Sequence, residues 1–353
     1  MSYLSASERI AILTPFRPAA RAGGVEVFCR QLQEALGPAR IFAPPETVGP
    51  RAHFLTRLGL LEPYRAAVGA HAFLQDYDEH PYDLVIANGL FGWPLRLAHP
   101  EVPMIQVYHF TMAGLAQTAL PLRSERLTTA LVAGWFDRQS GVGKKVVAVS
   151  ESVRREVRRF YRLESAVVPN SVDVNHFRRA SREDARDQLG LPKDRTIALF
   201  VGRAEYAKGF DVLRDIAAAM DDTLFLSVSR PADAPGNVRF FTGVPHETMP
   251  LLYSAADVYV SPSRYEGFNL SLVEALACEA PAVVSRTACA FADEPSDFAV
   301  VVERPTAEAF VEGIRRALKE GPRPGVRERV AEQFSSEVFS RNWRALAVSV
   351  RKV

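Results

Sequence analysis

The chain has 353 residues, which is too long for one ordinary hydrophobic core and predicts two domains of about 100–200 residues each. Its hydrophobic fraction of 48% and charged fraction of 24% are typical of globular proteins and exclude wholesale disorder. The net charge is only +2, and no basic tail is present, so we expect no nucleic-acid partner.

Cysteine usage and the amino-terminal residues bear on the compartment. Cys29, Cys278 and Cys289 are odd in number and form no C-x-x-C pair, which favours a reducing environment and gives no zinc-binding spacing. The first residues lack the basic and apolar segments of a signal peptide, and no uninterrupted apolar run reaches about 18 residues. These patterns predict a cytoplasmic protein that neither leaves the cell nor spans a membrane.

The first half of the chain alternates short apolar runs with helical patterns. The first run is followed by Gly23 and Gly24 and then by a helix-like pattern over residues 25–36, which predicts a strand, a glycine turn and a helix. Strands are predicted at residues 10–13, 84–87, 104–108 and 145–149. Buried strands separated by crossover helices predict a Rossmann-like domain with a parallel sheet.

The second half repeats this alternation after a polar, charged stretch at residues 175–194. Strands are predicted at residues 197–202, 224–228, 238–240, 258–260 and 282–285. The fold class is therefore α/β, with two Rossmann-like, doubly wound domains over residues 1–178 and 179–334. Ligands of such sheets bind outside the carboxyl ends of the strands, so we expect the chemistry just after the strands, in a cleft between the domains.

The segment with the strongest functional pattern runs from Leu251 to Ser285. A strand ends near Val260, a loop then carries Glu266, and a helix that contains Glu274 begins. The free amides at a helix N-terminus favour phosphate, and two carboxylates that bracket them suit the hydroxyls of a sugar and a ribose. The ordinary alternative makes both glutamates solvated charges, but the apolar neighbours of Glu274 argue against it.

This segment resembles the Glu-x7-Glu motif of the retaining family 4 glycosyltransferases, which have the GT-B fold. The resemblance implies that Glu266 lies at the transferred sugar and that Glu274 holds the ribose of the nucleotide. It also implies that the intervening backbone meets the diphosphate, through Gly267, Phe268, Asn269 and Leu270.

An upstream loop resembles the Gly-Arg…Lys-Gly loop of the same family. Here Gly202 and Arg203 follow a predicted strand, and Lys208 precedes a glycine. Two cations at the mouth of a strand are what a leaving diphosphate needs as negative charge develops on it. Taken singly, each cation has the alternative of an ordinary solvated side chain.

Two features of the first domain resemble that family, and a third is a candidate because it follows a predicted strand. Gly23 and Gly24 match the glycine-rich turn that closes over the donor phosphates, although any tight turn can hold two glycines. His109 follows a predicted strand, where the family often places a histidine beside the sugar and where a neutral imidazole can donate to a hydroxyl. Asn88 is a second candidate, on the acceptor side, with an ordinary turn as the alternative.

The resemblance covers nearly the whole chain, with one departure. Residues 169–177 are similar to the segment before the interdomain linker, and residues 335–353 resemble the last helix, which crosses back to the first domain. After the strand at 282–285 the family commonly has a glycine pair and a glutamate, whereas residues 286–294 read RTACAFADE. The base and sugar preference therefore cannot be carried over.

Two further patterns are less informative. Asp76-Tyr77-Asp78 matches a metal-binding Asp-x-Asp, but it follows a helical pattern and is expected to be a solvated turn, so we predict no metal site. A basic helix face follows residue 150, and it is either solvated surface or a peripheral contact with anionic lipid. Its members are Arg154, Arg155, Arg158, Arg159 and Arg162.

The resemblance implies a retaining glycosyltransferase of hexosyltransferase type. The donor would be a nucleoside diphosphate sugar carrying UDP or GDP, and the acceptor a hydroxyl of a glycan, a lipid or a small natural product. Glu266, His109, Arg203 and Lys208 are the expected catalytic residues, and no cofactor is expected. The alternatives are an epimerase of the same two-domain shape and a non-catalytic partner of a transferase that binds a nucleotide sugar.

Overall fold

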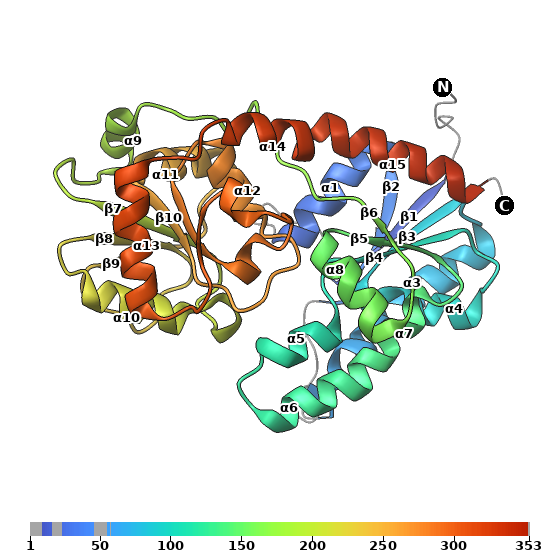
Figure 1. Cartoon of the computed structure of the whole chain (residues 1–353). Coiled ribbons are helices and arrows are strands. Elements are labelled where there is room, and N and C mark those ends of the chain that lie inside the picture. Colours follow the sequence, from blue (N-terminus) through green and yellow to red (C-terminus); the bar gives the residue numbers. More distant parts are fainter. Residues whose placement is uncertain (1–8, 16–22, 46–54, 57, 352–353) are drawn as a thin grey trace. The chain divides into compact units, whose positions relative to one another are not determined.

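The structure is a computed structural model, and it describes residues 9–15, 23–45, 55–56 and 58–351. The chain divides into two compact units, which are considered one at a time. The N-terminal unit comprises Met1–Asn170 and Glu337–Val353, and the C-terminal unit comprises Ser171–Ser336 (Figure 1).

The N-terminal unit is built on a sheet of six parallel strands in the order β2-β1-β3-β4-β5-β6. The strands are β1 (Ile10–Leu13), β2 (Ala39–Phe42), β3 (Leu84–Asn88), β4 (Met104–Tyr108), β5 (Lys145–Ala148) and β6 (Ala166–Val167). The chain starts in β1, adds β2 on one side and then returns to add β3 on the other. The carboxyl ends of β1 and β3 therefore form a topological switch point, where α/β sheets bind ligands.

Most helices of this unit pack on the faces of the sheet, and the helix over Arg123–Thr128 (α6) projects away from it (Figure 1). The helices are α1 (Gly24–Leu36), α3 (Leu61–Glu79), α4 (Trp93–Ala98), α5 (Met112–Thr118), α6 (Arg123–Thr128), α7 (Gly134–Gly141), α8 (Glu151–Glu156) and α15 (Ser336–Arg351). The last of these packs on α1, because Phe339 and Trp343 meet the ring of Phe28 edge to face and Arg344 Nε donates to Ala35 O at 2.7 Å. The C-terminal helix thus belongs to the N-terminal unit.

The C-terminal unit has the same plan, with six parallel strands in the order β12-β11-β10-β7-β8-β9. The strands are β7 (Ile197–Val201), β8 (Leu224–Val228), β9 (Val238–Phe241), β10 (Val258–Ser261), β11 (Ala282–Ser285) and β12 (Val300–Val302). The helices are α9 (Arg182–Leu189), α10 (Phe210–Ala219), α11 (Met249–Ala255), α12 (Leu270–Ala277), α13 (Ala307–Glu320) and α14 (Val326–Phe334). The switch point here lies between β7 and β10.

The predicted fold class is confirmed, since each unit is a doubly wound parallel sheet. Three strands were not predicted: Ala39–Phe42 contains an arginine and buries fully only its last residue, Ala166–Val167 is two residues long, and Val300–Val302 is three. The units meet at residues 170/171 and 336/337, against predicted boundaries at 178/179 and 334/335. No helix within the described ranges is long and apolar enough to cross a membrane.

The Asp-x-Asp pattern lies in the last turn of α3 rather than in a turn between elements. The expectation of a solvated turn is wrong for Asp76, because its carboxylate accepts a hydrogen bond from the hydroxyl of Tyr82 and pairs with Arg40. No cluster of three potential metal ligands occurs in the part of the chain that the structure describes.

Candidate functional site

Lys208 and Glu266 meet across the switch point of the C-terminal sheet. Lys208 follows β7, and Glu266 follows β10, the strand next to it. The Nζ of Lys208 lies 2.7 Å and 2.9 Å from the two carboxylate oxygens of Glu266. Their side chains are 27% and 9% exposed, so the pair is largely shielded but open on one side. Two residues 58 positions apart in sequence thus form one bidentate ion pair where ligands bind in this fold.

A second ion pair fastens together the two loops that carry this pair. Arg264 forms a fork with Asp211, with both nitrogen-to-oxygen distances 2.6 Å, and its guanidinium stacks on the ring of Tyr206 at 3.8 Å. The backbone amide of Arg264 also donates to Ala207 O at 2.8 Å. The fork geometry is specific to arginine, so this contact fixes the position of the Lys208 loop against the Glu266 loop.

Gly209 is required where these loops touch. Its φ is +69°, and a Cβ at this position would lie 2.1 Å from Pro262 O. Any other residue would therefore force the backbone of the loop after β10 away. Gly202, at the end of β7, is less constrained, because a Cβ there would make a tight contact of 3.3 Å with the ring of Phe200 and an ordinary one of 3.6 Å with the Lys208 stem.

Hydroxyl groups hold the Glu266 loop from the other side. Ser263 Oγ donates to the carboxylate of Glu266 at 2.9 Å, and the carbonyl of Ser263 accepts from Ser285 Oγ at 2.5 Å and Thr287 Oγ1 at 2.6 Å. Thr287 lies in the segment where the sequence departs from the family pattern. That segment supports the site through side chains, a role that its sequence did not suggest.

The helix α12 begins directly after the loop. Its N-cap is Asn269, a non-glycine residue with φ of +57°, whose Oδ1 accepts from the amide of Leu272 at 3.3 Å and whose Nδ2 donates to Ala288 O at 2.9 Å. The amide of Leu270, at the first helical position, has no intrahelical partner and marks the positive end of the helix dipole. Asn269 therefore shapes an anion-attracting helix end, and its side chain is used within the protein.

The neighbouring aromatic ring is structural. The ring of Phe268 packs against Phe291 at 5.5 Å and Phe334 at 5.4 Å, and only 4% of the residue is exposed. Only the backbone of Gly267 and Phe268 is therefore left to contact a ligand.

Glu274 lies one turn into α12 and is 7% exposed. Burial raises the pKa of Glu274 to about 7, and the hydroxyl of Tyr253, which donates to Oε2 at 2.8 Å, acts against this by lowering the pKa. The pKa of this carboxyl group therefore lies near neutral pH, and the buried phenol of Tyr253 orients it. Tyr253 lies on α11, 21 residues earlier, and no spacing in the sequence indicated this contact.

Arg203 differs from the other predicted site residues in where its side chain points. It is 75% exposed and pairs with Glu205 at 3.1 Å. The hydrogen bonds and ion pairs found among the described residues do not join Arg203 to Lys208 or Glu266. The structure thus brings Lys208 and Glu266 together and leaves Arg203 at the rim of the loop.

In the N-terminal unit, His109 and Asn88 meet at the carboxyl edge of the sheet. Asn88 Nδ2 donates to Leu13 O at 2.9 Å across the β1/β3 switch point, which fixes Asn88 Oδ1 toward His109 Nε2, 2.9 Å away. Since Oδ1 can only accept, Nε2 carries the proton and Nδ1 is the acceptor. Burial lowers the pKa of His109 to about 4, so the imidazole is neutral.

Two consequences follow for the predicted roles in this unit. Asn88 is 1% exposed and both ends of its amide are used within the protein, so it orients His109.

Gly23 and Gly24 lie at the start of α1 and are exposed, and neither has a positive φ, so the backbone conformation does not demand glycine. Residues 16–22, which precede them, lie outside the described ranges.

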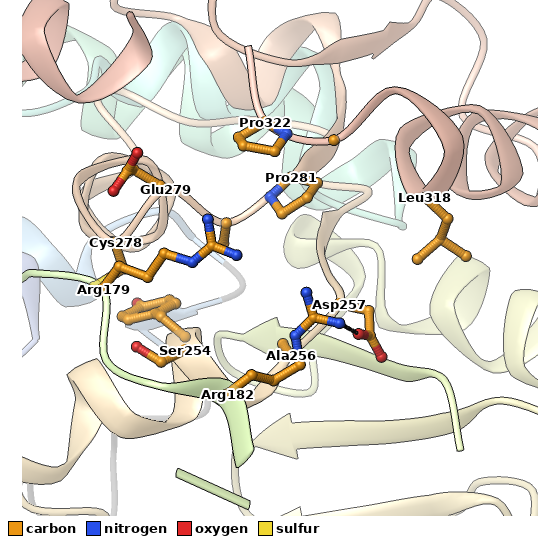
Figure 2. A pocket seen from close by; sticks show the side chains of 13 residues that line it. Arg179, Arg182, Ser254, Ala256, Asp257, Cys278, Glu279, Pro281, Leu318 and Pro322 are labelled. Carbon is orange, nitrogen blue, oxygen red and sulfur yellow. Dashed lines mark hydrogen bonds and ion pairs between the residues drawn. The ribbon is translucent and has the colours of Figure 1, made fainter. Parts of the chain in front are cut away.

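A small pocket of the C-terminal unit lies at the opposite edge of its sheet (Figure 2). It has a volume of about 130 Å³, and its lining includes Asp257 and Pro281, which immediately precede β10 and β11. Arg182 pairs with Asp257 at this edge (Figure 2). The Nη1 of Arg182 lies 2.6 Å from Oδ1 of Asp257. Because ligands of such sheets bind at the carboxyl ends, this pocket is not the candidate site.

Comparison with known proteins gives matches over both units. Residues 19–176 match the family model described as Glycosyltransferase Family 4, and residues 181–334 match the model described as Glycosyl transferases group 1. The D-inositol 3-phosphate glycosyltransferase of Streptomyces avermitilis is 30% identical over 330 residues, which cover 81% of this chain and 70% of that protein. The D-inositol 3-phosphate glycosyltransferase 2 of Catenulispora acidiphila is 28% identical over 331 residues, covering 79% and 76%.

Solved structures show the same fold. Sucrose-phosphate synthase from Thermosynechococcus elongatus has a TM-score of 0.80 at 22% identity, over 97% of this chain and 99% of that chain. Anabaena HepE in complex with UDP-glucose has a TM-score of 0.68 at 16% identity, over 97% and 99%. At these identities the similarity concerns architecture, and the predicted GT-B class of two Rossmann-like domains is confirmed.

Proposed function

Since the chain belongs to glycosyltransferase family 4 and is a glycosyltransferase, we propose that it moves a sugar from a nucleoside diphosphate donor to an acceptor hydroxyl with retention of anomeric configuration. The observation that carries the proposal is the largely shielded ion pair of Lys208 and Glu266 at the β7/β10 switch point, beside the N-terminus of α12. A cation, a carboxylate and helix amides in one place match the diphosphate and the hydroxyls of such a donor.

The ion pair has a specific role before the donor arrives. Lys208 and Glu266 neutralise each other, so neither is left as an uncompensated charge in a largely shielded position. A diphosphate oxygen replaces Glu266 as the partner of Lys208, and the released carboxylate accepts hydrogen bonds from sugar hydroxyls. Ser263 keeps its hydrogen bond to Glu266 during this exchange, which holds the carboxylate in the site.

In the chemical step the bond between the anomeric carbon and the departing phosphate oxygen breaks, and the acceptor oxygen bonds to the same face of that carbon. The proton of the acceptor hydroxyl passes to the departing phosphate. Lys208 and the amides near Leu270 stabilise the charge that develops on the diphosphate. Arg203 joins them by turning away from Glu205, its exposed partner in the structure.

The remaining predicted residues hold the donor. Glu274 accepts from the ribose hydroxyls, and the backbone of Gly267 and Phe268 faces the diphosphate. His109 binds a sugar hydroxyl through Nδ1 as acceptor, a refinement of the donor role expected from sequence, with Asn88 fixing the tautomer. Gly23 and Gly24 remain candidates for the turn over the phosphates.

On this proposal the sugar donor carries UDP or GDP, and no metal is required. Support for a nucleotide sugar comes from Anabaena HepE, a protein of the same fold whose structure was solved in complex with UDP-glucose. A thermal-shift panel of UDP, GDP and their sugars identifies the base, because a ligand that binds the native state raises its melting temperature by mass action. No shift with any nucleoside diphosphate would contradict the proposal.

The transfer itself is tested by the release of nucleoside diphosphate in the presence and absence of an acceptor extract. We expect acceptor-dependent release, with Lys208→Ala and Glu266→Ala each lowering kcat by about 10²–10³-fold, as loss of one transition-state contact does. Lys319→Ala, an exposed lysine at the end of α13, is the matched control and keeps full activity. Equal rates for all four proteins would refute the site, and an inverted anomer in the product would refute retention.

A further inference from the structure

A row of apolar side chains is exposed on one continuous helical segment of the N-terminal unit. The segment runs through α6, the π-helical turn η2 (Thr129–Ala133) and α7. Leu127, Leu131 and Trp135 recur every four residues on it, and they are 61%, 65% and 54% exposed. Leu122, at the N-cap of α6, is 56% exposed. These four residues are called the apolar ridge.

The ridge is not the core-facing side of the helix. Ala133, Asp137 and Ser140 lie on the buried side and are at most 2% exposed. The segment is therefore apolar on its solvent side, which reverses the usual pattern of a surface helix. Single exposed leucines need no explanation, but a contiguous row that includes a tryptophan marks an interaction surface.

The surroundings of the ridge are strongly basic. Residues 122–164 carry ten Lys and Arg against five Asp and Glu, a net +5 in a chain whose total is +2. Five exposed arginines lie on α8, on the π-helical turn η3 (Val157–Tyr161) that continues it, and at the C-cap of that turn: Arg154, Arg155, Arg158, Arg159 and Arg162. Figure 1 shows α8 next to α7 in this unit.

Hydrogen bonds join the basic helix to the helix of the ridge. Tyr161 donates through its hydroxyl to Asp137 at 2.6 Å, and Arg138 Nε donates to Tyr161 O at 3.0 Å. Some of the positive charge is locally offset, since Arg154 pairs with Glu151 at 2.7 Å and Arg158 lies 3.5 Å from Glu164. These hydrogen bonds nevertheless hold the basic helix against the helix that carries the apolar ridge.

We propose that this feature docks on an anionic phospholipid surface, with the ridge inserted at the level of the headgroups and the arginines among the lipid phosphates. Tryptophan and leucine are the residues that anchor helices at this depth, and basic residues around them add electrostatic attraction to anionic lipid. A second copy of the chain fits poorly, because a self-complementary contact would bring arginines against arginines. The basic helix face that the sequence indicated is thus accompanied by an exposed apolar row on the neighbouring helix.

The test is co-sedimentation of the full chain with phosphatidylcholine vesicles, with and without about one third phosphatidylglycerol. We expect binding only to the anionic vesicles, weakened by salt, with a blue shift of tryptophan emission. The shift reports Trp135, because Trp343 is fully buried and Trp93 is partly buried. A double variant Leu127→Glu/Leu131→Glu should lower the partition coefficient at least about tenfold.

Controls keep the outcome decisive. Leu318→Glu changes an exposed leucine of the other unit and should leave vesicle binding unchanged. Unaltered circular dichroism melting of the double variant shows that it is folded. Absence of wild-type binding, equal binding to both vesicle types, or equal binding by the double variant would each overturn the proposal. So would self-association of the wild type, seen by analytical ultracentrifugation, that the double variant abolishes.

Discussion

The pH dependence of donor binding is the sharpest consequence of the geometry around Glu274. Burial raises its pKa to about 7, and the Tyr253 hydroxyl lowers it. A carboxylate can accept from two ribose hydroxyls, whereas the protonated acid loses part of that capacity. Below pH 7 the protonated form dominates, so donor affinity should fall as the pH falls.

The size of this effect follows from the fraction of Glu274 that is ionised. With a pKa of about 7, about one tenth is ionised at pH 6 and about nine tenths at pH 8, so the dissociation constant should change by about tenfold. The assay is calorimetric titration with UDP or GDP across this range. Tyr253→Phe removes the hydroxyl that donates a hydrogen bond to Glu274. It should therefore raise the pKa of Glu274 further and move the midpoint of the binding profile to higher pH.

Glu274→Gln is the matched control for this titration. The phosphate groups of the nucleotide also titrate near neutral pH, and the amide variant retains their contribution while losing that of Glu274. We expect the variant to bind about tenfold more weakly than wild type at pH 8, since hydrogen bonds to charged groups are the stronger ones. If the wild type, Tyr253→Phe and Glu274→Gln gave superimposable pH profiles, Glu274 would not contact the ribose.

Two other predictions concern residues that the sequence did not single out. Arg264→Lys keeps the charge but loses the fork to Asp211 and the stack on Tyr206, so the donor KM in steady-state kinetics should rise about tenfold, and an unchanged KM would refute the bracing role. Burial raises the pKa of Asp137 to about 7, above its unfolded value, so its contribution to stability is complete at low pH and declines as the pH rises from about 4 to 7. Asp137→Asn should flatten the pH dependence of denaturant unfolding in that window by up to about 1.4 kcal/mol per pH unit, and an unaltered slope would contradict this.

The sequence predicts the fold well because long buried strands have a strong signal. The runs at 84–87 and 104–108 are mostly apolar and are buried on both faces, as central parallel strands are, and each prediction agrees with the structure within one residue. The short edge strands were missed because their pairing depends on tertiary contacts. Val300–Val302 is three residues long and is stabilised by its neighbour β11.

The site is predictable only where a motif places several residues close together. Glu266 and Glu274 share one loop and helix, and their spacing is visible in the sequence. The partners that orient them are 58 and 21 residues away, namely Lys208 and Tyr253, and only the resemblance suggested the first. The exposed direction of Arg203 and the tautomer of His109 depend on contacts that no local pattern encodes.

The segment that departs from the family pattern offers a last prediction. Ser285 and Thr287 both donate to the carbonyl of Ser263, whose hydroxyl in turn positions Glu266. Thr287→Val leaves the Ser263 carbonyl with one hydrogen-bond partner, Ser285. It should raise the KM for the sugar donor less than about threefold. The double variant Ser285→Ala/Thr287→Val leaves a buried carbonyl without a partner, a loss of about 1–3 kcal/mol.

We expect the double variant to raise the donor KM about tenfold, because the loop that carries Glu266 is no longer held on this side. Thr306→Val is the control: it removes the N-cap of α13 and costs about 1 kcal/mol of stability, but it should leave the donor KM unchanged. Equal donor KM values for the double variant and this control would mean that the departing segment acts through stability alone. A higher KM in the double variant only would assign it to the positioning of Glu266.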